Sequence, residues 1–344
     1  MTPRGLSAVI GFLARVAITA ALILAGWLLG GLPLTIIATL IAVPLFVRTQ
    51  DGRIWWSAIL SRLRFRLASA RGLTHFSDSD RLPGTLGTTT LVQTQPYAIL
   101  GGRDRYSVVV RFDAEHSDWL DGIDSEPGLV AVSITTQTGA AVRSGFAIAP
   151  SAGALTRSVL HEALPITAGI PTAWACLTWR GDAPPTEAIE AFLQRAGLQP
   201  LDGPAVAAVV STAFVPDREP ITSWEHTGPG SAHEFKNRYE HAGFTSVVWH
   251  VASGAGRVAE LLGDESRTGL GRVTAVYTPQ PGIGGLRQSV LVTLTCPDEH
   301  SLAREASALR VRATGAAVTL APCATTMASS FAVGLGVGVA GVGR

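Results

Sequence analysis

The sequence predicts a mixed α/β (or α+β) cytoplasmic domain preceded by an N-terminal two-helix transmembrane hairpin. Three observations lead to this fold class. The apolar fraction is 47% and the charged fraction only 15%, a balance typical of a membrane-attached protein. Apart from Arg15, residues 6–47 carry no charge. In residues 88–344, β-rich runs alternate with helical patterns, which is typical of a domain that contains both kinds of element.

The first fifty residues are expected to cross a membrane twice. The stretch 6–47 is long enough for two helices of about 20 residues each. Gly30-Gly31-Leu32-Pro33 supplies the break, because glycine permits a tight turn and proline is tolerated in the first turn of a helix. We therefore expect helices at about 8–29 and 32–48. Close packing against other helices is expected at Gly26, Trp27 and Gly30.

Three other interpretations of this stretch stay open. A secretory signal peptide would have a shorter apolar region followed by a polar chain, whereas here the apolar character resumes after Pro33. A single tilted span with a kink at Pro33 is the second alternative. A pair of helices buried in a soluble domain is the third. We favour the hairpin because the apolar length matches two spans.

The distribution of arginine predicts the orientation of the hairpin. Arg4 precedes the first helix, Arg15 lies near its start, and the connection between the helices contains no arginine. The positive-inside rule then places both termini and the main domain in the cytoplasm, in a multi-pass protein of the inner (plasma) membrane. A single span would place the domain across the membrane from Arg4. The arginines after the second helix are Arg48, Arg53, Arg62, Arg64, Arg66 and Arg71.

Residues 51–71 are expected to form a basic amphipathic juxtamembrane helix. Trp55, Ile59, Leu63 and Leu67 recur at every fourth position and mark one helical face. Tryptophan suits the headgroup zone of a bilayer, and arginine suits anionic lipid phosphates. A plain helix docked on the soluble domain is the alternative. The expected membrane anchors are Trp55, Trp56, Arg62, Arg64 and Arg66.

Residues 72–87 are expected to be a linker, because they contain Gly72, Pro83, Gly84 and Gly87, and the mixed domain then occupies 88–344. No internal repeat is evident in it. Residues 206–214 are ambiguous between helix and strand. Strands are expected at 91–100, 106–112, 129–136, 142–148, 172–179, 244–251, 271–278, 288–295 and 316–320. Helices are expected at 152–163, 184–196, 258–262 and 298–310.

The C-terminal tail 327–343 is apolar and contains five glycines. Glycine at every second or third position disfavours a helix, so a terminal strand or loop packed on the domain is preferred to a third membrane span. The three cysteines, Cys176, Cys296 and Cys323, form no CxxC pair and are expected to be reduced, buried thiols.

Motifs for nucleotide or metal chemistry are incomplete. A P-loop needs a lysine after its glycines, and the one lysine, Lys236, has no glycine-rich lead. A zincin helix needs HExxH, but His233-Glu234 is followed by Phe-Lys-Asn. His233 and His241 would share a face if the segment were helical. We expect these residues and His226 to be surface or packing histidines, with no metal site.

Other candidates for catalysis are equally incomplete. The acidic stretch 113–126 is typical of solvated loops, and Ser158 and His161 lack the third member of a triad. The net charge of +1 does not favour nucleic acid as a partner. The sequence therefore predicts a non-enzymatic protein with no cofactor and no catalytic, cofactor-binding or metal site.

Several motifs, taken in order, resemble one known family. The basic segment Gly52–Arg66 has the form G-R-x-W/x-W followed by L-R-x-R. Gly102–Asp113 has the form G-x-x-x-Y-x-V-V-x-R-x-D, Thr172–Arg180 reads TAWACLTWR, and the chain closes on a glycine-rich tail, Gly334–Gly343. This layout resembles EccE, a membrane component of the actinobacterial type VII (ESX) secretion system.

The resemblance implies a non-catalytic structural subunit of the inner-membrane secretion complex, which helps to assemble or stabilise the export machine. It implies as partners the other membrane subunits, including an FtsK-like ATPase, beside the anionic lipid headgroups expected above. The alternative is a membrane-tethered, glycosyltransferase-like enzyme acting on a lipid-linked substrate. Such an enzyme would need a carboxylate pair for a metal-bound nucleotide, for which Asp113 and Glu115 have the only tempting spacing.

Overall fold

The computed structural model describes residues 55–71, 74–76, 89–102, 104–112, 118–123, 125–138, 173–216, 220–262, 269–280, 285–324 and 326–338. The chain divides into two units, Met1–Arg71 and Gly72–Arg344. The first contains helix α2, Trp55–Ala70, in the segment for which a helix is expected. The expected hairpin, with Gly26, Trp27 and Gly30, lies outside the described residues. None of the helices that the structure describes combines the length and the apolarity that crossing a bilayer requires.

The second unit is a mixed α/β domain dominated by an antiparallel sheet, which confirms the predicted mixture and gives it the α+β form. Its described strands join in one 12-stranded sheet in the order β1-β7-β8-β9-β11-β10-β5-β6-β4-β3-β2, and β12 also pairs with β9. The strands are β1 His75–Phe76, β2 Thr90–Gln93, β3 Ile99–Gly102, β4 Arg105–Arg111, β5 Leu129–Thr138, β6 Ala173–Arg180, β7 Ala232–Glu234, β8 Tyr239–His241, β9 Phe244–Ser253, β10 Leu270–Pro279, β11 Leu286–Cys296 and β12 Thr319–Pro322.

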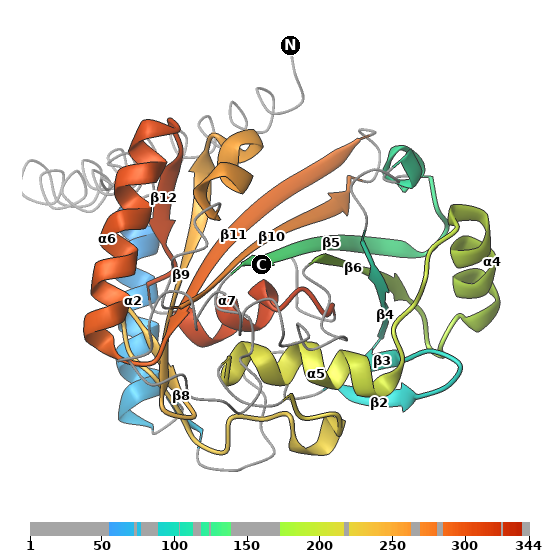
Figure 1. The fold of residues 1–344 in the computed structure, drawn as a ribbon, viewed down its shortest axis with the longest axis horizontal. Helices are drawn as coiled ribbons and strands as arrows, with labels where there is room; N and C mark the ends of the chain where they lie inside the picture. The colour runs from blue at the N-terminus through green and yellow to red at the C-terminus, as the bar shows by residue number, and fades with distance from the viewer. Residues whose placement is uncertain are drawn as a thin grey trace, which may run out of the picture. The chain divides into compact units, whose positions relative to one another are not determined.

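Helices cover both faces of this sheet (Figure 1). Helices α5 and α7 lie on the face around which the sheet curves, and α4 and α6 lie on the opposite face. The α-helices are α4 Thr186–Ala196, α5 Gly203–Phe214, α6 Glu299–Gly315 and α7 Met327–Gly334, and the 3-10 helices are η4 Asp118–Gly122, η5 Trp224–His226 and η6 Ala255–Leu262.

Local sequence signals explain the helix ends. Helix α4 follows Pro185 and stops at Gly197, which adopts a left-handed φ of 63°. The ambiguous segment 206–214 is helical because the Asp202 carboxylate accepts a hydrogen bond of 2.9 Å from the Ala205 amide, and a proline follows in the first turn. Burial on nearly every side then accommodates the valines of α5, which by propensity alone favour a strand.

The structure corrects several predicted boundaries. The strand expected at 91–100 is two strands, β2 and β3, because the segment around Pro96 interrupts the ladder. Part of the expected linker, His75–Phe76, is strand β1, which pairs with β7. The start of the tail is helix α7 rather than a strand or loop. The elements expected at 142–148 and 152–163 lie outside the described residues.

The domain contains an internal repeat that the sequence did not reveal. One half runs β4, η4, β5, β6, α4, α5, and the other runs β9, η6, β10, β11, α6, β12, α7. From the centre of the sheet outwards, the strands follow as β5-β6-β4 on one side and β10-β11-β9 on the other. The two halves therefore have the same order in the chain and the same order in space.

Hydrogen bonds and register give the residue-by-residue equivalence of the halves. Ser107 pairs with Thr178, their hydroxyls 2.8 Å apart, and Ser246 pairs with Thr295 in the same way at 2.7 Å. Val110 lies opposite Pro200, as Trp249 lies opposite Pro322. By this equivalence Thr135 of β5 corresponds to Thr274 of β10. These two residues face each other at the centre, with hydroxyls 3.0 Å apart, so a pseudo-twofold axis passes between them.

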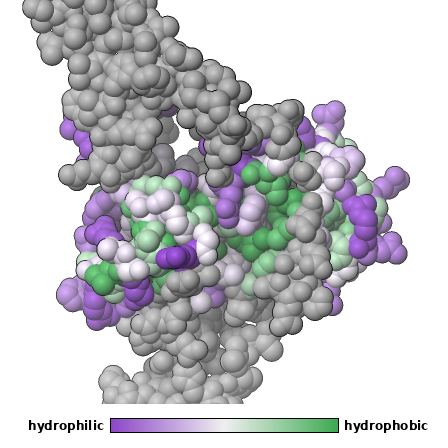
Figure 2. Space-filling view, turned by 90° about the horizontal axis from the view of Figure 1, so that it is seen from above, coloured by the Kyte–Doolittle hydropathy of each residue, from purple (hydrophilic) through white to green (hydrophobic). Residues whose placement is uncertain are grey.

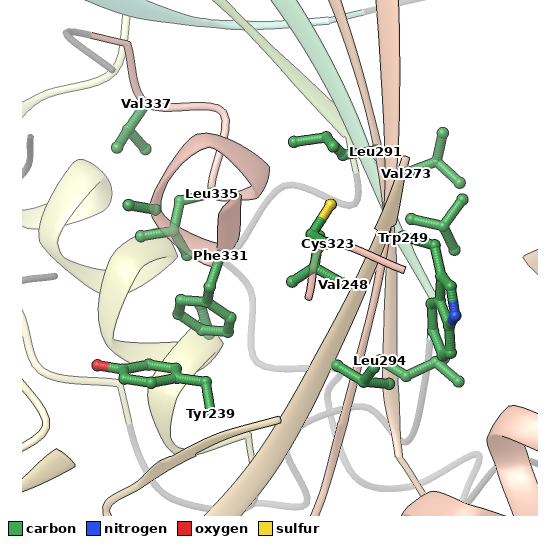
Figure 3. Packing of buried hydrophobic residues seen from close by; sticks show 14 of the residues in the cluster. Tyr239, Val248, Trp249, Val273, Leu291, Leu294, Cys323, Phe331, Leu335 and Val337 are labelled. Atoms are coloured by element: carbon green, nitrogen blue, oxygen red, sulfur yellow. The ribbon is translucent and has the colours of Figure 1, made fainter. Parts of the chain in front are cut away.

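The two faces of the sheet carry separate apolar layers. In the first half, Val108, Val110 and Trp179 pack with α4, whereas Val109 and Trp174 face α5. Figure 3 shows the same alternation in the second half, where Trp249 and Val248, neighbours on β9, lie on opposite sides of the strands. The alternation follows from the two-residue period of a strand and places polar as well as apolar residues under α7.

We expect the cap of α5 to contribute measurably to stability. Asp202→Ala removes the acceptor for the Ala205 amide and should lower the free energy of unfolding by about 1 kcal/mol in equilibrium urea denaturation. Asp202→Asn keeps an acceptor oxygen and should stay close to wild type. Equal losses in the two variants would show that the carboxylate acts by its charge alone.

Candidate functional site

The expected membrane anchors lie on helix α2. Arg62, Arg64 and Arg66 are exposed, and Trp55 and Trp56 form the first turn of the helix. Large apolar side chains are exposed on the same helix. The exposed fractions are 37% for Leu60, 52% for Leu63 and 50% for Leu67. Within its own unit, α2 therefore presents leucines and arginines together.

The histidines do not share a helix. His233 and His241 lie on adjacent antiparallel strands, β7 and β8, because the segment forms a hairpin. His226 is exposed and its Nδ1 lies 3.1 Å from the Ser223 hydroxyl. Among the residues that the structure describes, no three His, Cys, Asp or Glu side chains gather as a metal would require.

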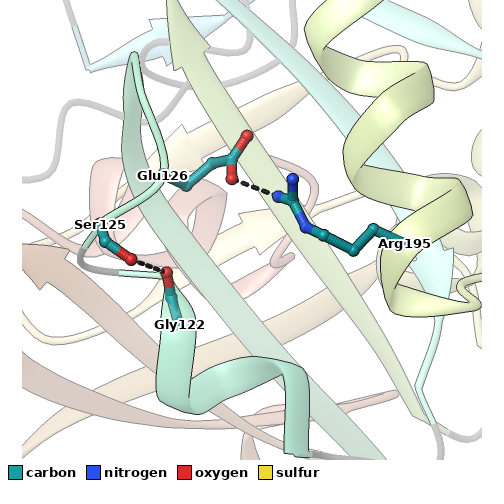
Figure 4. A network of polar contacts seen from close by, with 4 residues as sticks. All are labelled: Gly122, Ser125, Glu126 and Arg195. Atoms are coloured by element: carbon teal, nitrogen blue, oxygen red, sulfur yellow. Dashed lines mark hydrogen bonds and ion pairs between the residues drawn. The ribbon is translucent and has the colours of Figure 1, made fainter.

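The acidic stretch is only partly described, and Asp113 and Glu115 lie outside that part. Glu126 forms an ion pair with Arg195 of α4, and the Ser125 hydroxyl donates to the Gly122 carbonyl at 2.9 Å (Figure 4). The ion pair ties the loop before β5 to α4, and the hydrogen bond stabilises the loop itself. The carboxylate of Glu126 therefore has a structural partner.

The three cysteines are buried thiols that are not joined in disulfide bonds, as the sequence predicts. Burial raises the pKa of the Cys176 thiol to about 12, although hydrogen bonds from Ser107 and Thr178 act in the opposite direction. Burial also raises the pKa of Cys296 to about 12. Both thiols are therefore protonated and poor nucleophiles at neutral pH.

The structure reveals a polar surface inside the domain that sequence reasoning missed. On the face that carries α5 and α7, the central strands present a band of buried serine and threonine side chains, which we call the hydroxyl face. A C-terminal segment, Met327–Gly338, packs on this band, and we call it the strap. The hydroxyl face consists of Ser107, Thr178, Ser133, Thr135, Thr274, Thr293, Thr295 and Ser246.

Glycine spacing lets the strap approach the sheet. A Cβ added at Gly334 would lie 2.8 Å from Thr293 Oγ1, and one added at Gly336 would overlap Thr135. At Gly338 it would meet Ser107 and Cys176. Gly336 and Gly338 also have positive φ angles of 63° and 80°, which favour glycine. Every second residue of the strap thus faces the sheet.

The hydroxyl face binds the carbonyl groups of the strap. Thr274 donates to the Gly334 carbonyl at 2.8 Å, and Ser133 donates to that of Gly336 at 3.3 Å. The indole N–H of Trp174 lies between two acceptors, the carbonyl of Leu335 at 3.2 Å and that of Gly336 at 3.1 Å. These bonds satisfy backbone groups that would otherwise be buried without partners.

The start of the strap is held by a carboxylate. Glu234 Oε1 accepts a hydrogen bond of 3.2 Å from the Ala328 amide in the first turn of α7. Burial raises the pKa of Glu234, while the amides of Ala328 and Met327 act to lower it. A negative charge at this end of the helix also interacts favourably with the helix dipole.

A buried histidine network lies next to the strap. His241 Nδ1 lies 3.1 Å from the Phe214 carbonyl and must donate to it, so Nε2 accepts from the Ser246 hydroxyl at 2.7 Å. Ser246 in turn accepts from Thr295. Burial lowers the pKa of His241 to about 3, and the charge of Arg272 adds to this effect. The imidazole is therefore neutral at physiological pH.

Arg272 is the most unusual residue of this region. Its side chain is 1% exposed and lies over the ring of Phe331, with the guanidinium carbon 5.2 Å from the ring centroid. Among the residues that the structure describes, its three nitrogens have no hydrogen-bond acceptor. Burial lowers the pKa of Arg272 to about 9, so the group remains charged at neutral pH.

Only weak signals in the sequence pointed to this arrangement. The glycines at 334, 336 and 338 have a period of two, and threonine alternates with apolar residues in β11. The first pattern is typical of a segment that packs closely on a sheet, and the second of a strand with one polar face. Neither pattern predicts which strands contact the strap. No protein-family model matches this sequence, and no curated protein sequence matches it.

We expect Gly336→Ala to detach the strap. A methyl group there overlaps Thr135 and forces alanine into a left-handed conformation, which should lower the free energy of unfolding by about 2–5 kcal/mol. Urea denaturation followed by tryptophan fluorescence would report both stability and the environment of Trp174. Gly256→Ala, where a Cβ meets nothing within 4 Å, is the control and should change stability by less than about 0.5 kcal/mol.

We also expect His241 to make the domain sensitive to acid. The folded pKa of about 3 lies below the ordinary value of 6.5, so between these values the unfolded chain binds one more proton. The free energy of unfolding should therefore fall as the pH falls through this window, by up to about 1.4 kcal/mol per unit from this group. Urea denaturation at several pH values should show a shallower slope for His241→Asn than for wild type. The matched control is His226→Asn, at an exposed histidine.

Proposed function

We propose that the chain is a non-catalytic subunit of a type VII (ESX) secretion complex in the inner membrane. In this role it helps to assemble or stabilise the export machine, together with other membrane subunits that include an FtsK-like ATPase. The ordered motifs from Gly52 to Gly343 that resemble EccE support the family. The arrangement of helix α2 after the long apolar N-terminal stretch supports the attachment to a membrane.

The observation that carries the proposal is the surface of α2. Leu63 and Leu67 are each about half exposed, and Arg62, Arg64 and Arg66 are exposed on the same helix. Exposed leucines are stabilised when they enter the boundary between headgroups and acyl chains, and arginines there bind anionic phosphates. A helix with both, directly after residues 6–47, suits the cytoplasmic surface of a membrane.

The α+β domain suits a structural role in the cytoplasm. The hydroxyl face is occupied by the strap, and the apolar layers on both faces of the sheet are packed by α4, α5, α6 and α7. Seen from above, the domain also presents an apolar area between hydrophilic margins (Figure 2). Ile134 of β5 and Ala275 of β10 are register partners, lie on the face opposite the strap and are half-buried. Such a surface is suited to contact with another subunit.

We expect the arginines of α2 to be needed for assembly. Replacing Arg62, Arg64 and Arg66 by glutamate reverses the charge that meets anionic lipid, and should reduce both membrane association and recovery of other secretion subunits several-fold. The measurement is a pull-down of the full-length chain in mild detergent, with mass spectrometry of the partners. The matched control replaces three exposed arginines of the domain, Arg111, Arg257 and Arg310, by glutamate.

Three outcomes would contradict the proposal. The first is normal secretion and complex recovery by the α2 variant. The second is recovery of the wild-type chain without any other secretion subunit. The third is tight binding of a nucleotide sugar in calorimetry, which would favour the membrane-tethered enzyme instead. A reporter fused behind Arg344 tests the orientation separately and should be found in the cytoplasm.

A further inference from the structure

A fully buried guanidinium faces no acceptor in the part of the domain that the structure describes. Within that part, the Nε, Nη1 and Nη2 atoms of Arg272 have no hydrogen-bond partner, and neither has the Oγ1 atom of Thr293. The two residues are direct register partners on β10 and β11, so their unpaired donors lie on the same face of the sheet. A positively charged guanidinium and a hydroxyl thus form a cluster of hydrogen-bond donors inside the protein.

The neighbours of Arg272 do not neutralise it. The ring of Phe331 lies over the guanidinium and attracts the cation, but it accepts no hydrogen bond in the plane of the fork. His241, which packs on the same Phe331 ring at 4.9 Å, is neutral, and both of its nitrogens are already bonded. A buried charge with neither a counter-ion nor hydrogen bonds is strongly unfavourable, and removing such a charge often stabilises a protein.

The internal repeat shows that the fold itself does not require an arginine here. By the equivalence of the two halves, Arg272 corresponds to Ser133, and Thr293 corresponds to Cys176. Ser133 and Cys176 occupy their positions with small neutral groups, and the strap packs directly on them. The second half places the cationic side chain of Arg272 at the equivalent position, under α7.

We propose that Arg272 and Thr293 bind a small free oxyanion of the phosphate or sulfate class beneath helix α7. A tetrahedral oxyanion offers several acceptor oxygens, which the planar guanidinium fork and one hydroxyl bind in the way that arginine binds phosphate. The site is closed, since Arg272 is 1% exposed, so the ion has to be small. The short strap is the element that has to lift for the ion to enter.

The test uses the full-length chain in mild detergent at neutral pH. Inorganic phosphate replaces sodium chloride at constant ionic strength, and the thermal unfolding midpoint is recorded. We expect a saturable rise of about 3–6 °C at ten times the dissociation constant for wild type. Arg272→Met should show no rise, and Thr293→Val should need several-fold more phosphate for the same rise. Arg257→Met, at an exposed arginine, is the control and should behave as wild type.

The alternatives give different results. A wild-type midpoint that does not change with phosphate overturns the proposal, whether the guanidinium is solvated by internal water or left unpaired. An equal rise in Arg272→Met also overturns it and indicates an adventitious ion only. Glycerol 3-phosphate carries the same phosphoryl group on a carbon chain and should have no effect. An equal effect would assign the site to a phosphoryl headgroup rather than a free ion. If Arg272→Met does not fold, the wild-type and Thr293→Val titrations decide.

Discussion

The pairing of β5 with β10 is the contact on which the rest of the domain depends. It joins two halves of the same topology into one sheet, and the hydroxyls of Thr135 and Thr274 meet at its centre. Because the halves are related by a pseudo-twofold axis there, each contributes one helix to the outer face and one to the face that carries the strap. Separating this ladder would leave each half with an open, apolar sheet edge.

The interior of the domain is polar where the strap packs on the sheet. Eight serine and threonine side chains form the hydroxyl face, and burying so many hydroxyls is unfavourable unless they are hydrogen-bonded. Most of them are hydrogen-bonded to one another, as in Ser107 with Thr178, or to carbonyls of the strap, as in Thr274 with Gly334. Among the described residues, the Thr293 hydroxyl has no such partner. The strap is therefore an integral part of the core, and its glycines are required by the closeness of the approach.

The membrane-facing and cytoplasmic parts of the proposal rest on different physical effects. On α2, the proposed membrane contact would combine insertion of the exposed leucines with attraction of the arginines to anionic lipid. In the described part of the domain, the apolar side chains pack within the fold, whereas the Arg272 guanidinium is buried without a hydrogen-bond acceptor. The proposed assembly role needs an attachment, which we assign to α2, and a folded body, which the second unit supplies.

The sequence determined the types of most elements, because these depend on local periods and caps. The strands β5, β10 and β11 and the helix α4, which ends at Gly197, were predicted from the sequence. The burial of the cysteines was predicted as well. The tail was predicted as a strand or loop from its glycines. Only its docking on the sheet, with Glu234 capping its first turn, makes residues 327–334 helical. The repeat escaped the sequence analysis because its two halves share only short scattered matches, such as Ser-Val-Val at 107–109 and 246–248, Thr135 with Thr274, and Leu-Thr at 177–178 and 294–295. Strand order, the hydroxyl face and the isolation of Arg272 were decided by tertiary structure alone, since each arises from contacts between residues far apart in the chain.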